Sequence, residues 1–213
     1  DASFACAQAG CDSVLGYGTY AWDMSTRVES VVDSDPNVVL GLFLYKSDEQ
    51  EIDIEWARWG DEGAEANNMD YVVQPHEEGV SGLTFRLPPG HTHTRHQFTY
   101  TPSVVEFKVI DLDTKTTVHE WSTTKNIPTP EDLPPIINLW MMSGIKPAKE
   151  VTSIDIDSFN FEQDASSSIG SNNSSASNGS ESEASSSIGS NNSSASALSA
   201  RVVYILLALV AAL

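Results

Sequence analysis

The chain has 213 residues and a formal net charge of −19, with 30 acidic against 11 basic side chains. Nearly all of this charge lies in the first 163 residues, because only Asp164, Glu181, Glu183 and Arg201 are charged beyond them. A negative field of this size repels phosphate backbones, which excludes nucleic acid as a partner, whereas a neutral substrate is not penalised.

Composition divides the chain into three regions. Residues 1–163 mix aromatic, β-branched and charged side chains, and about 160 residues are enough to bury a sizeable core. Residues 164–200 are almost wholly Ser, Asn, Ala and Gly, and residues 201–213 are apolar apart from Arg201 and Tyr204. We therefore expect one globular domain, one flexible stalk and one apolar tail.

Two cysteines, Cys6 and Cys11, stand near the start of the chain. A pair is too few for a structural zinc site, which needs four ligands. In a secreted protein they could form a small local disulfide, but spacing alone fixes no geometry. A disulfide and two free thiols both stay open.

Short candidate strands follow one another along the first region. Residues 17–24 alternate aromatic with small or polar side chains, residues 38–45 form an apolar run typical of a strand buried on both faces, and residues 49–56 alternate acidic and apolar side chains strictly. Further candidates are residues 69–73, 82–87, 97–100, 104–110, 116–121, 136–142 and 153–161.

No window of helical length carries an apolar stripe at i, i+3, i+4 and i+7. The Pro-Ser pair at 102–103 falls between two candidate strands and predicts a hairpin turn. Many short strands between Gly, Pro and Asp turns predict an all-β domain, an antiparallel sandwich or barrel.

The stalk contains a repeat, since residues 165–177 return unchanged at 184–196. With one Ile per copy it cannot bury enough apolar surface to fold, so we expect a disordered, glycosylated spacer. Ser/Asn-rich sequence produces acceptor patterns easily, and here they begin at Asn172, Asn173, Asn178, Asn191 and Asn192.

The tail is shorter than the roughly 20 apolar residues that span a bilayer. Small residues near 191–194, a polar spacer of about nine residues and a terminal apolar stretch match a GPI-attachment signal. A short single-span anchor and an incidental apolar end are the alternatives. A GPI signal implies a secreted protein at the cell surface, bound to the membrane only through residues 201–213.

The acidic strand carries the strongest chemical signal. Alternate side chains of a strand share one face, so Glu49, Glu51, Asp53 and Glu55 should line one side while the isoleucines between them enter the core. On a solvated convex face such a row is only a charged surface. In a cleft, repulsion and desolvation separate the pKa values and produce the protonated and ionised carboxyl pair that glycoside hydrolysis needs.

Four stretches resemble glycoside hydrolase family 16, the laminarinase and lichenase family. Residues 51–55, Glu-Ile-Asp-Ile-Glu, are similar to its E-x-D-x-E signature. Residues 16–20 resemble the segment before its first long strand, residues 39–45 the apolar strand that leads to the signature, and residues 136–140 its Asn-Leu-Trp strand. The match covers about residues 15–161, with the same order and spacing.

The resemblance implies a concanavalin A-like jelly-roll sandwich and a retaining double displacement on a β-1,3- or β-1,3-1,4-glucan-like substrate. By position, Glu51 is the implied nucleophile, Glu55 the acid/base, and Asp53 the residue that steers the charge of the nucleophile. Bare geometry does not choose this pairing, because residues i and i+4 of a strand lie about 13 Å apart at Cα while retaining carboxyl groups lie about 5–5.5 Å apart.

Aromatic faces can stack on sugar rings. Trp140 lies where the resembled family carries a cleft tryptophan, and Asn138 on the same strand is a second candidate for substrate binding. Tyr45, Trp22 and Trp59 are further candidates, each with core or surface packing as the alternative. Trp121 is more readily explained by core or surface packing, and Trp56 should point into the core because it follows Glu55.

We expect no metal at the catalytic site and no cofactor. The histidine-rich run at 91–96 has neither a nearby Cys nor a helical His-x-x-x-His spacing, so a polar loop explains it better than zinc does. The resemblance allows a structural calcium, for which Asp111, Asp113, Asp155 and Asp157 could supply oxygen ligands, with nothing to select among them.

Only sixteen residues precede Tyr17, fewer than in the resembled family, so we expect an N-terminally truncated sandwich with an unpaired edge. The leading hypothesis is a monomeric, surface-anchored, endo-acting hydrolase of β-glucan-type polysaccharide. A non-catalytic, lectin-like glycan-binding module is the first alternative, and the acidic trio disfavours it. A cell-wall transglycosylase with the same residues is the second and stays open.

Overall fold

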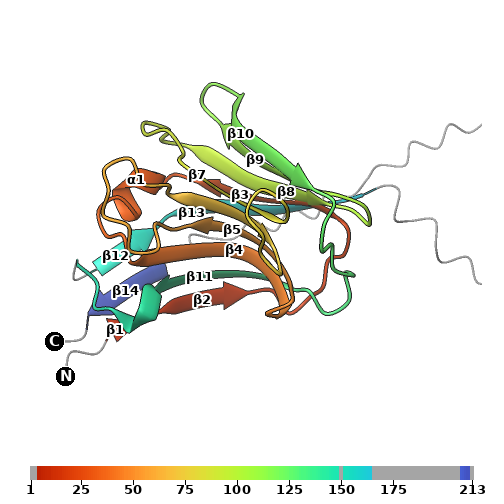
Figure 1. Ribbon diagram of the computed structural model, residues 1–213, viewed down its shortest axis with the longest axis horizontal. Coiled ribbons are helices and arrows are strands. Elements are labelled where there is room, and N and C mark those ends of the chain that lie inside the picture. The colour runs from red at the N-terminus through yellow and green to blue at the C-terminus, as the bar shows by residue number, and fades with distance from the viewer. Residues whose placement is uncertain (1–3, 149–150, 165–206, 212–213) are drawn as a thin grey trace, which may run out of the picture.

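Two antiparallel β-sheets packed face to face make up the body of the protein (Figure 1). The structure is a computed structural model that describes residues 4–148, 151–164 and 207–211. Most of the expected stalk and tail, residues 165–206 and 212–213, lies outside the described residues, so the spacer and the GPI signal stay predictions.

The six-stranded sheet carries the candidate site. Each strand is antiparallel to its neighbours in this sheet. In spatial order the strands are β2 (Ala7–Gly10), β11 (Pro135–Met141), β4 (Val38–Ser47), β5 (Gln50–Trp56), β6 (Met69–Val73) and β7 (Gly82–Phe85).

The second sheet has five strands and covers one face of the first. In spatial order they are β10 (Thr116–Thr123), β9 (Val105–Asp111), β8 (Thr94–Tyr100), β3 (Gly18–Met24) and β13 (Ile156–Gln163). A smaller sheet joins β1 (Phe4–Ala5), β14 (Leu207–Ala211) and β12 (Val151–Ile154).

Helix is scarce in the described part of the chain. It comprises one turn of α-helix, α1 (Val28–Val31), and one 3-10 turn, η1 (Met142–Gly144). Among the described residues, no helix has the length and apolar character needed to cross a membrane.

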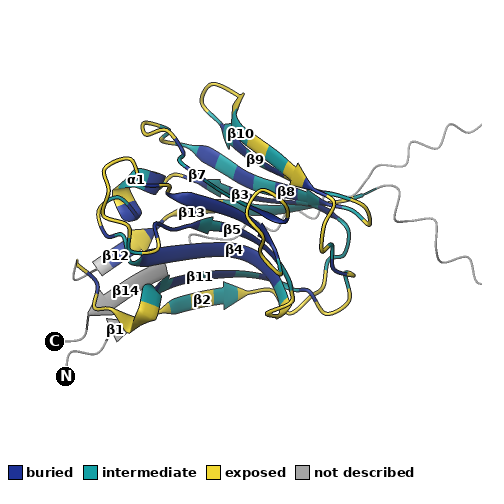
Figure 2. Cartoon of the chain, viewed as in Figure 1, coloured by how far each residue is buried: buried dark blue, intermediate teal, exposed yellow. Residues whose placement is uncertain are grey.

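The core fills the space between the two large sheets (Figure 2). Strand β4 contributes Leu40, Leu42 and Leu44, and β5 contributes Ile52 and Ile54, all without solvent exposure. Burying each such side chain stabilises the fold by about 1.5–3 kcal/mol. The aromatic side of the core comes from the facing sheet, with Tyr20, Trp22, Phe98, Tyr100 and Phe107.

The all-β sandwich predicted from the sequence is confirmed. Residues 38–44 of the apolar run are buried on both faces, as predicted, and Tyr45 at its end is half-buried. The hairpin turn is also confirmed, since β8 and β9 pair across it and the Thr101 hydroxyl accepts hydrogen bonds from the amides of Ser103 and Val104. The stretch 153–161, predicted as one strand, is divided at Asp155, whose backbone bonds to Ser25 and Thr26 instead of continuing a ladder.

The start of the chain contributes a strand that the sequence did not predict. Residues before Tyr17 supply β2, which pairs with β11 and forms one edge of the six-stranded sheet, and the expected truncation stays a prediction. The small side chains of β2 gave no strand signal. Cys6 and Cys11 flank this strand as free, exposed thiols. Five residues of extended chain separate two Cα atoms by about 16 Å, far beyond the 4.4–6.8 Å that a disulfide spans.

Candidate active site

One cavity lies on the face of the six-stranded sheet that points away from the core. Its volume is about 330 Å³. Strands β2, β11, β4 and β5 line it with Gln8, Gly41, Phe43, Tyr45, Glu51, Asp53, Glu55, Ile136, Asn138 and Trp140.

Strand β5 sends its three carboxylates into this cavity. Ile52, Ile54 and Trp56 are fully buried on the core side, so Glu51, Asp53 and Glu55 must occupy the opposite side, as the alternation predicts. The row has three members, not four: the strand begins at Gln50, and Glu49 lies exposed in the turn before it.

Strand register aligns residues from distant parts of the sequence across the sheet. Asn138 of β11 pairs with Gly41 of β4, Gly41 pairs with Glu55 of β5, and Glu55 pairs with Asp70 of β6. We call Asn138, Gly41, Glu55 and Asp70 the central row. It brings an amide, an open position and two carboxylates side by side.

Gly41 keeps the central row open. A Cβ at this position would lie 2.7 Å from Asn138 Oδ1 and 3.1 Å from the ring of Phe43, both too close for an undisturbed contact. The Gly41 amide also donates to Asn138 Oδ1 at 3.2 Å, which fixes the orientation of the Asn138 side chain. The space between Glu55 and Asn138 therefore depends on a residue without a side chain.

Burial separates the protonation states of the three carboxyl groups. It raises the pKa of Glu55 to about 8, with added repulsion from Asp70 and Glu51. It raises the pKa of Asp53 well above its usual range, and repulsion from Glu55 and Glu51 adds to the shift. Burial also raises the pKa of Glu51, but the hydrogen bond from Asp53 acts in the opposite direction.

At about 8, the pKa of Glu55 favours its protonated form at neutral pH. The hydrogen bond between Asp53 and Glu51 favours the protonated form of Asp53 and the ionised form of Glu51. Of the three, Glu51 is the group whose ionised form a neighbour stabilises. The cavity thus holds a carboxylic acid and a carboxylate on one strand, the combination that general acid and nucleophilic catalysis require.

Asp70 is a fourth buried carboxylate, which sequence reasoning did not identify. It is 4% exposed, and its Oδ2 accepts a hydrogen bond from Trp59 Nε1 at 2.5 Å. Burial raises its pKa, while the hydrogen bond of Trp59 is the largest cause that lowers it. In the sequence, only the polar position between Met69 and Tyr71 pointed to Asp70. Because of the connection at 57–68, the sequence could not show which residue of β5 it would face.

The aromatic candidates divide between the cavity and the core. Trp140 and Tyr45 line the cavity, and the Tyr45 hydroxyl donates to Asp48 at 2.9 Å. Trp59 is 41% exposed, and its ring centre lies 6.2 Å from that of Trp140, so it extends the aromatic surface beyond the cavity wall. Trp56 is buried in the core, as predicted.

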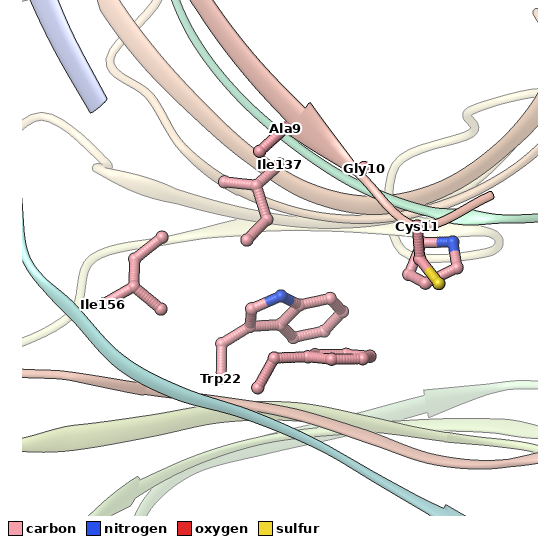
Figure 3. A pocket seen from close by; sticks show the side chains of 8 residues that line it. Ala9, Gly10, Cys11, Trp22, Ile137 and Ile156 are labelled. Atoms are coloured by element: carbon pink, nitrogen blue, oxygen red, sulfur yellow. The ribbon is translucent and has the colours of Figure 1, made fainter. Parts of the chain in front are cut away.

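Trp22 does not belong to the site, contrary to its selection as a candidate. It is 1% exposed and packs against Phe98 and Phe159 of its own sheet. Its ring borders a separate apolar cavity of about 200 Å³ between the sheets, with Ile137 and Ile156 nearby (Figure 3). Aromatic and small residues alternate on β3, and that alternation does not tell which face meets the core.

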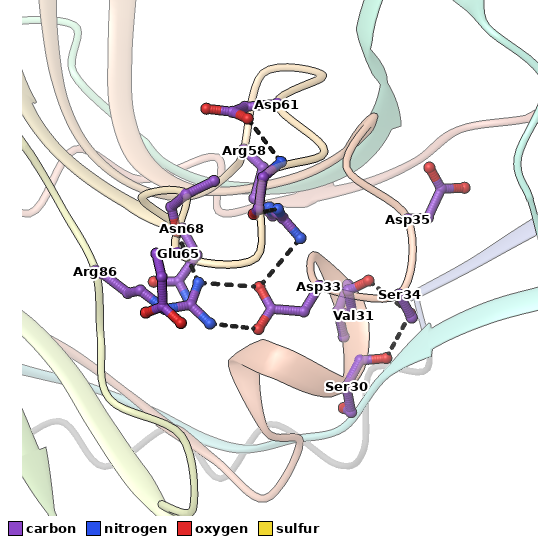
Figure 4. A network of polar contacts seen from close by, with 12 residues as sticks. Ser30, Val31, Asp33, Ser34, Asp35, Arg58, Asp61, Glu65, Asn68 and Arg86 are labelled. Atoms are coloured by element: carbon purple, nitrogen blue, oxygen red, sulfur yellow. Dashed lines mark hydrogen bonds and ion pairs between the residues drawn. The ribbon is translucent and has the colours of Figure 1, made fainter.

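A network of ion pairs fixes the connection at 57–68 that carries Trp59 (Figure 4). Asp33 pairs with Arg58 at 3.6 Å and with Arg86 at 3.0 Å. Arg86 also donates to the carbonyl of Ala66 at 2.7 Å, and Arg58 donates to that of Gly63. Through the Asp33 carboxylate, this connection is thus tied to the segment that follows α1 and to Arg86, the residue after β7.

The aspartates proposed as calcium ligands do not form a calcium site in the described residues. Asp111 accepts from the amides of Asp113 and Thr114 and bonds His91 at 2.6 Å. His93 lies between Asp113 and Asp157, at 3.7 and 3.3 Å. The described residues contain no cluster of three or more His, Cys, Asp or Glu side chains arranged to hold a metal. The carboxylate oxygens of Asp111, Asp113 and Asp157 face hydrogen-bond donors, which is a poor fit for a cation that takes six to eight oxygen ligands.

No family model matches the chain, and no curated protein matches it in sequence. Solved structures do match it. A native glycosidic hydrolase aligns at a TM-score of 0.44 and 21% identity, over 66% of this chain and 64% of the other. The β-glucanase of Bacillus licheniformis aligns at 0.44 and 18%, over 66% and 65%. Scytalido-glutamic peptidase, bound to a peptide-based transition-state analogue, aligns at 0.44 and 8%, over 77% and 81%.

The alignment spans less than two thirds of the length of either hydrolase. One sandwich architecture can host unrelated chemistries. The activity of this chain therefore has to be inferred from its own side chains.

Proposed function

We propose that this chain is a retaining glycoside hydrolase of the family 16 type that cuts β-glucan-like polysaccharides at internal bonds. Support comes from one observation above all: three carboxyl groups of a single strand share one cavity, and burial keeps Glu55 protonated while Asp53 stabilises the ionised form of Glu51. The order Glu-x-Asp-x-Glu, which resembles the family signature, supports the same roles.

In the first step, a Glu51 oxygen attacks the anomeric carbon of the substrate as the glycosidic bond breaks. Glu55 gives its proton to the departing oxygen, so the leaving sugar departs as a neutral alcohol. The products are a glycosyl ester on Glu51 and an ionised Glu55. Asp53 keeps its hydrogen bond to Glu51 while Glu51 loses its negative charge on forming the ester.

In the second step, Glu55 acts as the base. It takes a proton from a water molecule, the water oxygen attacks the anomeric carbon, and the bond to Glu51 breaks. Glu51 leaves as a carboxylate and Glu55 is protonated again, which restores the starting state with net retention at the anomeric carbon.

The lining of the cavity suits a neutral sugar. Trp140 and Tyr45 offer aromatic faces for stacking, and Asn138 offers an amide for hydrogen bonding to hydroxyl groups. The strongly negative chain disfavours sulfated or otherwise anionic polymers. We expect a β-1,3- or β-1,3-1,4-linked glucan as substrate.

Substitution of the two glutamates tests the mechanism. Glu51→Gln should abolish turnover, because an amide cannot form the glycosyl ester. Glu55→Ala should cripple polysaccharide hydrolysis but spare the first step on activated aryl glycosides, whose leaving oxygen barely needs a proton. Added azide should then rescue the second step and yield a β-glycosyl azide, detected by mass spectrometry and NMR.

Glu106→Gln, which removes an exposed carboxylate from the other sheet, is the control and should retain parental activity. Parental polysaccharide hydrolysis by Glu51→Gln would contradict the mechanism, whereas a parent that binds glycan but hydrolyses none would leave the lectin-like glycan-binding module as the better explanation. Products longer than the substrate, formed when an acceptor oligosaccharide is supplied, would identify a transglycosylase that uses the same residues.

The cellular context of the enzyme is a separate part of this proposal. The Ser/Asn-rich residues 164–200 would act as a spacer, and residues 201–213 as a GPI-attachment signal, so that a secreted monomer is held at the cell surface. The composition of these segments supports this assignment.

A further inference from the structure

One buried carboxylate has no part in the two steps above. Asp70 lies between Met69 and Tyr71, both fully buried in the core, so its side chain points to the cavity face of the sheet. Its Oδ1 is buried and has no hydrogen-bond partner among the described residues. An incompletely paired buried carboxylate is unfavourable for folding, which suggests that it has another role.

Register places this carboxylate next to the general acid. Asp70 pairs with Glu55 across β5 and β6, and directly opposed side chains of antiparallel strands have Cβ atoms about 4.5–5.5 Å apart. Through Oδ2, the same carboxylate accepts the indole hydrogen bond of Trp59. Asp70 therefore contacts the aromatic surface on one side and adjoins the acid on the other.

Trp59 is held in an unusual backbone conformation. Its φ of 51° lies in the left-handed region, which a bulky L-residue rarely adopts. The surrounding connection over-determines this conformation: Arg58 pairs with Asp33, and the Gly60 amide donates to the carbonyl of Pro36 at 2.9 Å. Among the described non-glycine residues with a positive φ, Trp59 is the one that presents an aromatic ring to Trp140, and backbone strain of this kind is often found at functional positions.

We propose that Asp70 is a positioning residue of this site: from β6 it holds Glu55 in its proton-bearing form, and through Oδ2 it holds the Trp59 indole beside Trp140. The first half rests on the proposed function, because it concerns the acid role of Glu55. One carboxylate thereby couples the protonation of the acid to the placement of a sugar-stacking ring.

The charges that face Glu55 come from two strands. Glu51 and Asp53 lie on its own strand, and Asp70 lies on β6. On the other side, β4 and β11 present Gly41 and Asn138, which carry no charge. His76 and Glu78, from the connection between β6 and β7, act on Asp70 with opposite signs.

Loss of the Asp70 charge should change the pKa of Glu55 in one direction. After burial, repulsion by Asp70 is the largest cause of the raised pKa of Glu55. An uncharged residue at position 70 therefore lowers that pKa, and Glu55 loses its proton at a lower pH. Glu55 must be protonated for the first step, so the basic limb of the pH–rate profile moves to lower pH.

Asp70→Asn is the main test, because asparagine keeps an oxygen acceptor for the Trp59 indole and removes only the charge. The basic limb of kcat/KM should move to lower pH by at least half a pH unit, while Glu106→Gln leaves it in place. NMR titration of protein labelled with 13C at the Glu side-chain carboxyl carbons should show the same downward shift for Glu55, assigned through Glu55→Gln.

The NMR titration separates this inference from the proposed function, because it needs no turnover. If the protein hydrolyses no glycan but Asp70→Asn lowers the pKa of Glu55, the effect of Asp70 on Glu55 is supported and the proposed hydrolase activity is refuted. If the parent hydrolyses glucan, but Asp70→Asn changes neither the basic limb of kcat/KM nor the NMR titration of Glu55, the inference is overturned.

Trp59→Phe tests the second half, since it keeps the Asp70 charge and removes the hydrogen-bond donor. KM for glucan oligosaccharides should rise at least threefold with kcat changed less than twofold. An unchanged KM would overturn the positioning of the ring, whatever the result for Asp70→Asn.

Discussion

At the scale of single residues, the roles of the carboxyl groups in the site depend on which of them is protonated. Asp53 sits between two glutamates and is 5% exposed, and burial together with repulsion from Glu55 and Glu51 raises its pKa, which favours its protonated form as a hydrogen-bond donor to Glu51. It is thereby distinguished from its neighbours, although all three residues carry the same functional group. Burial and neighbouring charge, not chemical type, assign the roles.

Asp53→Asn tests this assignment. Asparagine keeps an N–H donor for Glu51 but cannot share a proton with it, so kcat on polysaccharide should fall roughly tenfold, equivalent to about 1.4 kcal/mol, without vanishing. Calorimetric glycan binding should stay close to the parental value, since stacking and neutral hydrogen bonds hold the sugar. A parental kcat would mean that the Asp53 proton has no part in the reaction.

At the scale of strands, the site exists because separate segments meet in one register. The central row draws on β11, β4, β5 and β6, whose members are distant in sequence. A change in register of one residue would turn the side chains of a strand to the opposite face. The core faces of these strands hold the register, so the site depends on buried residues that never touch it.

Gly41→Ala tests how far the cavity depends on β4. The new Cβ would displace the Asn138 side chain, whose flexible end can move, so we expect the melting temperature to change little while kcat/KM falls at least tenfold. Gly10→Ala is a matched control on the same sheet, because its Cβ would meet only ordinary contacts at 3.5 Å. Equal activity in both variants would show that the space beside Asn138 is not used.

The sequence alone could predict the strands better than it could predict which residues of different segments come into contact. Strict alternation at 49–56 fixed which side chains share a face, and the apolar run at 38–45 predicted a buried strand. Trp22 was assigned wrongly because its strand alternates without showing which face is buried. Asp70 and Trp59 come together across a long connection with a left-handed residue, which no local pattern encodes. Residues 7–10, Ala-Gln-Ala-Gly, gave no signal because they contain no large apolar side chain that could show an alternation.

At the scale of the whole molecule, the tail has two possible fates. A GPI signal would be removed during maturation, yet Leu207–Ala211 forms β14, the central strand of the smallest sheet. Neither of the two large sheets contains β14, but β14 contacts β2 and β11, which line the cavity.

We expect the mature protein to lack residues 202–213, and phospholipase C to release it from cells. A variant ending at residue 200 should then keep the glucan-hydrolysing activity of the full chain. Intact mass spectrometry that finds Leu213 on the mature protein would refute the GPI assignment and favour retention of β14.

The buried carboxyl groups should also govern how stability depends on pH. The pKa of Glu55 is raised in the folded state, from an ordinary value of 4.5 to about 8. Its favourable contribution is therefore complete below about pH 4.5 and is lost as the pH rises toward 8, because folding then requires either a buried charge or an extra proton. Over that window the free energy of unfolding should fall by about 3–5 kcal/mol.

Glu55→Gln should remove most of this dependence. Chemical denaturation at pH 4.5 should give similar free energies of unfolding for the variant and the parent, whereas at pH 8 the variant should be more stable by a few kcal/mol. The exposed Glu106→Gln control should follow the parent at both pH values. Greater stability in an inactive variant would mean that the burial which keeps Glu55 protonated, and so able to act as an acid, also makes its ionised form destabilising at pH 8. Parallel curves for parent and Glu55→Gln would instead show that Glu55 is solvated and titrates as an ordinary surface carboxylate, which would remove the physical basis for its role as the acid.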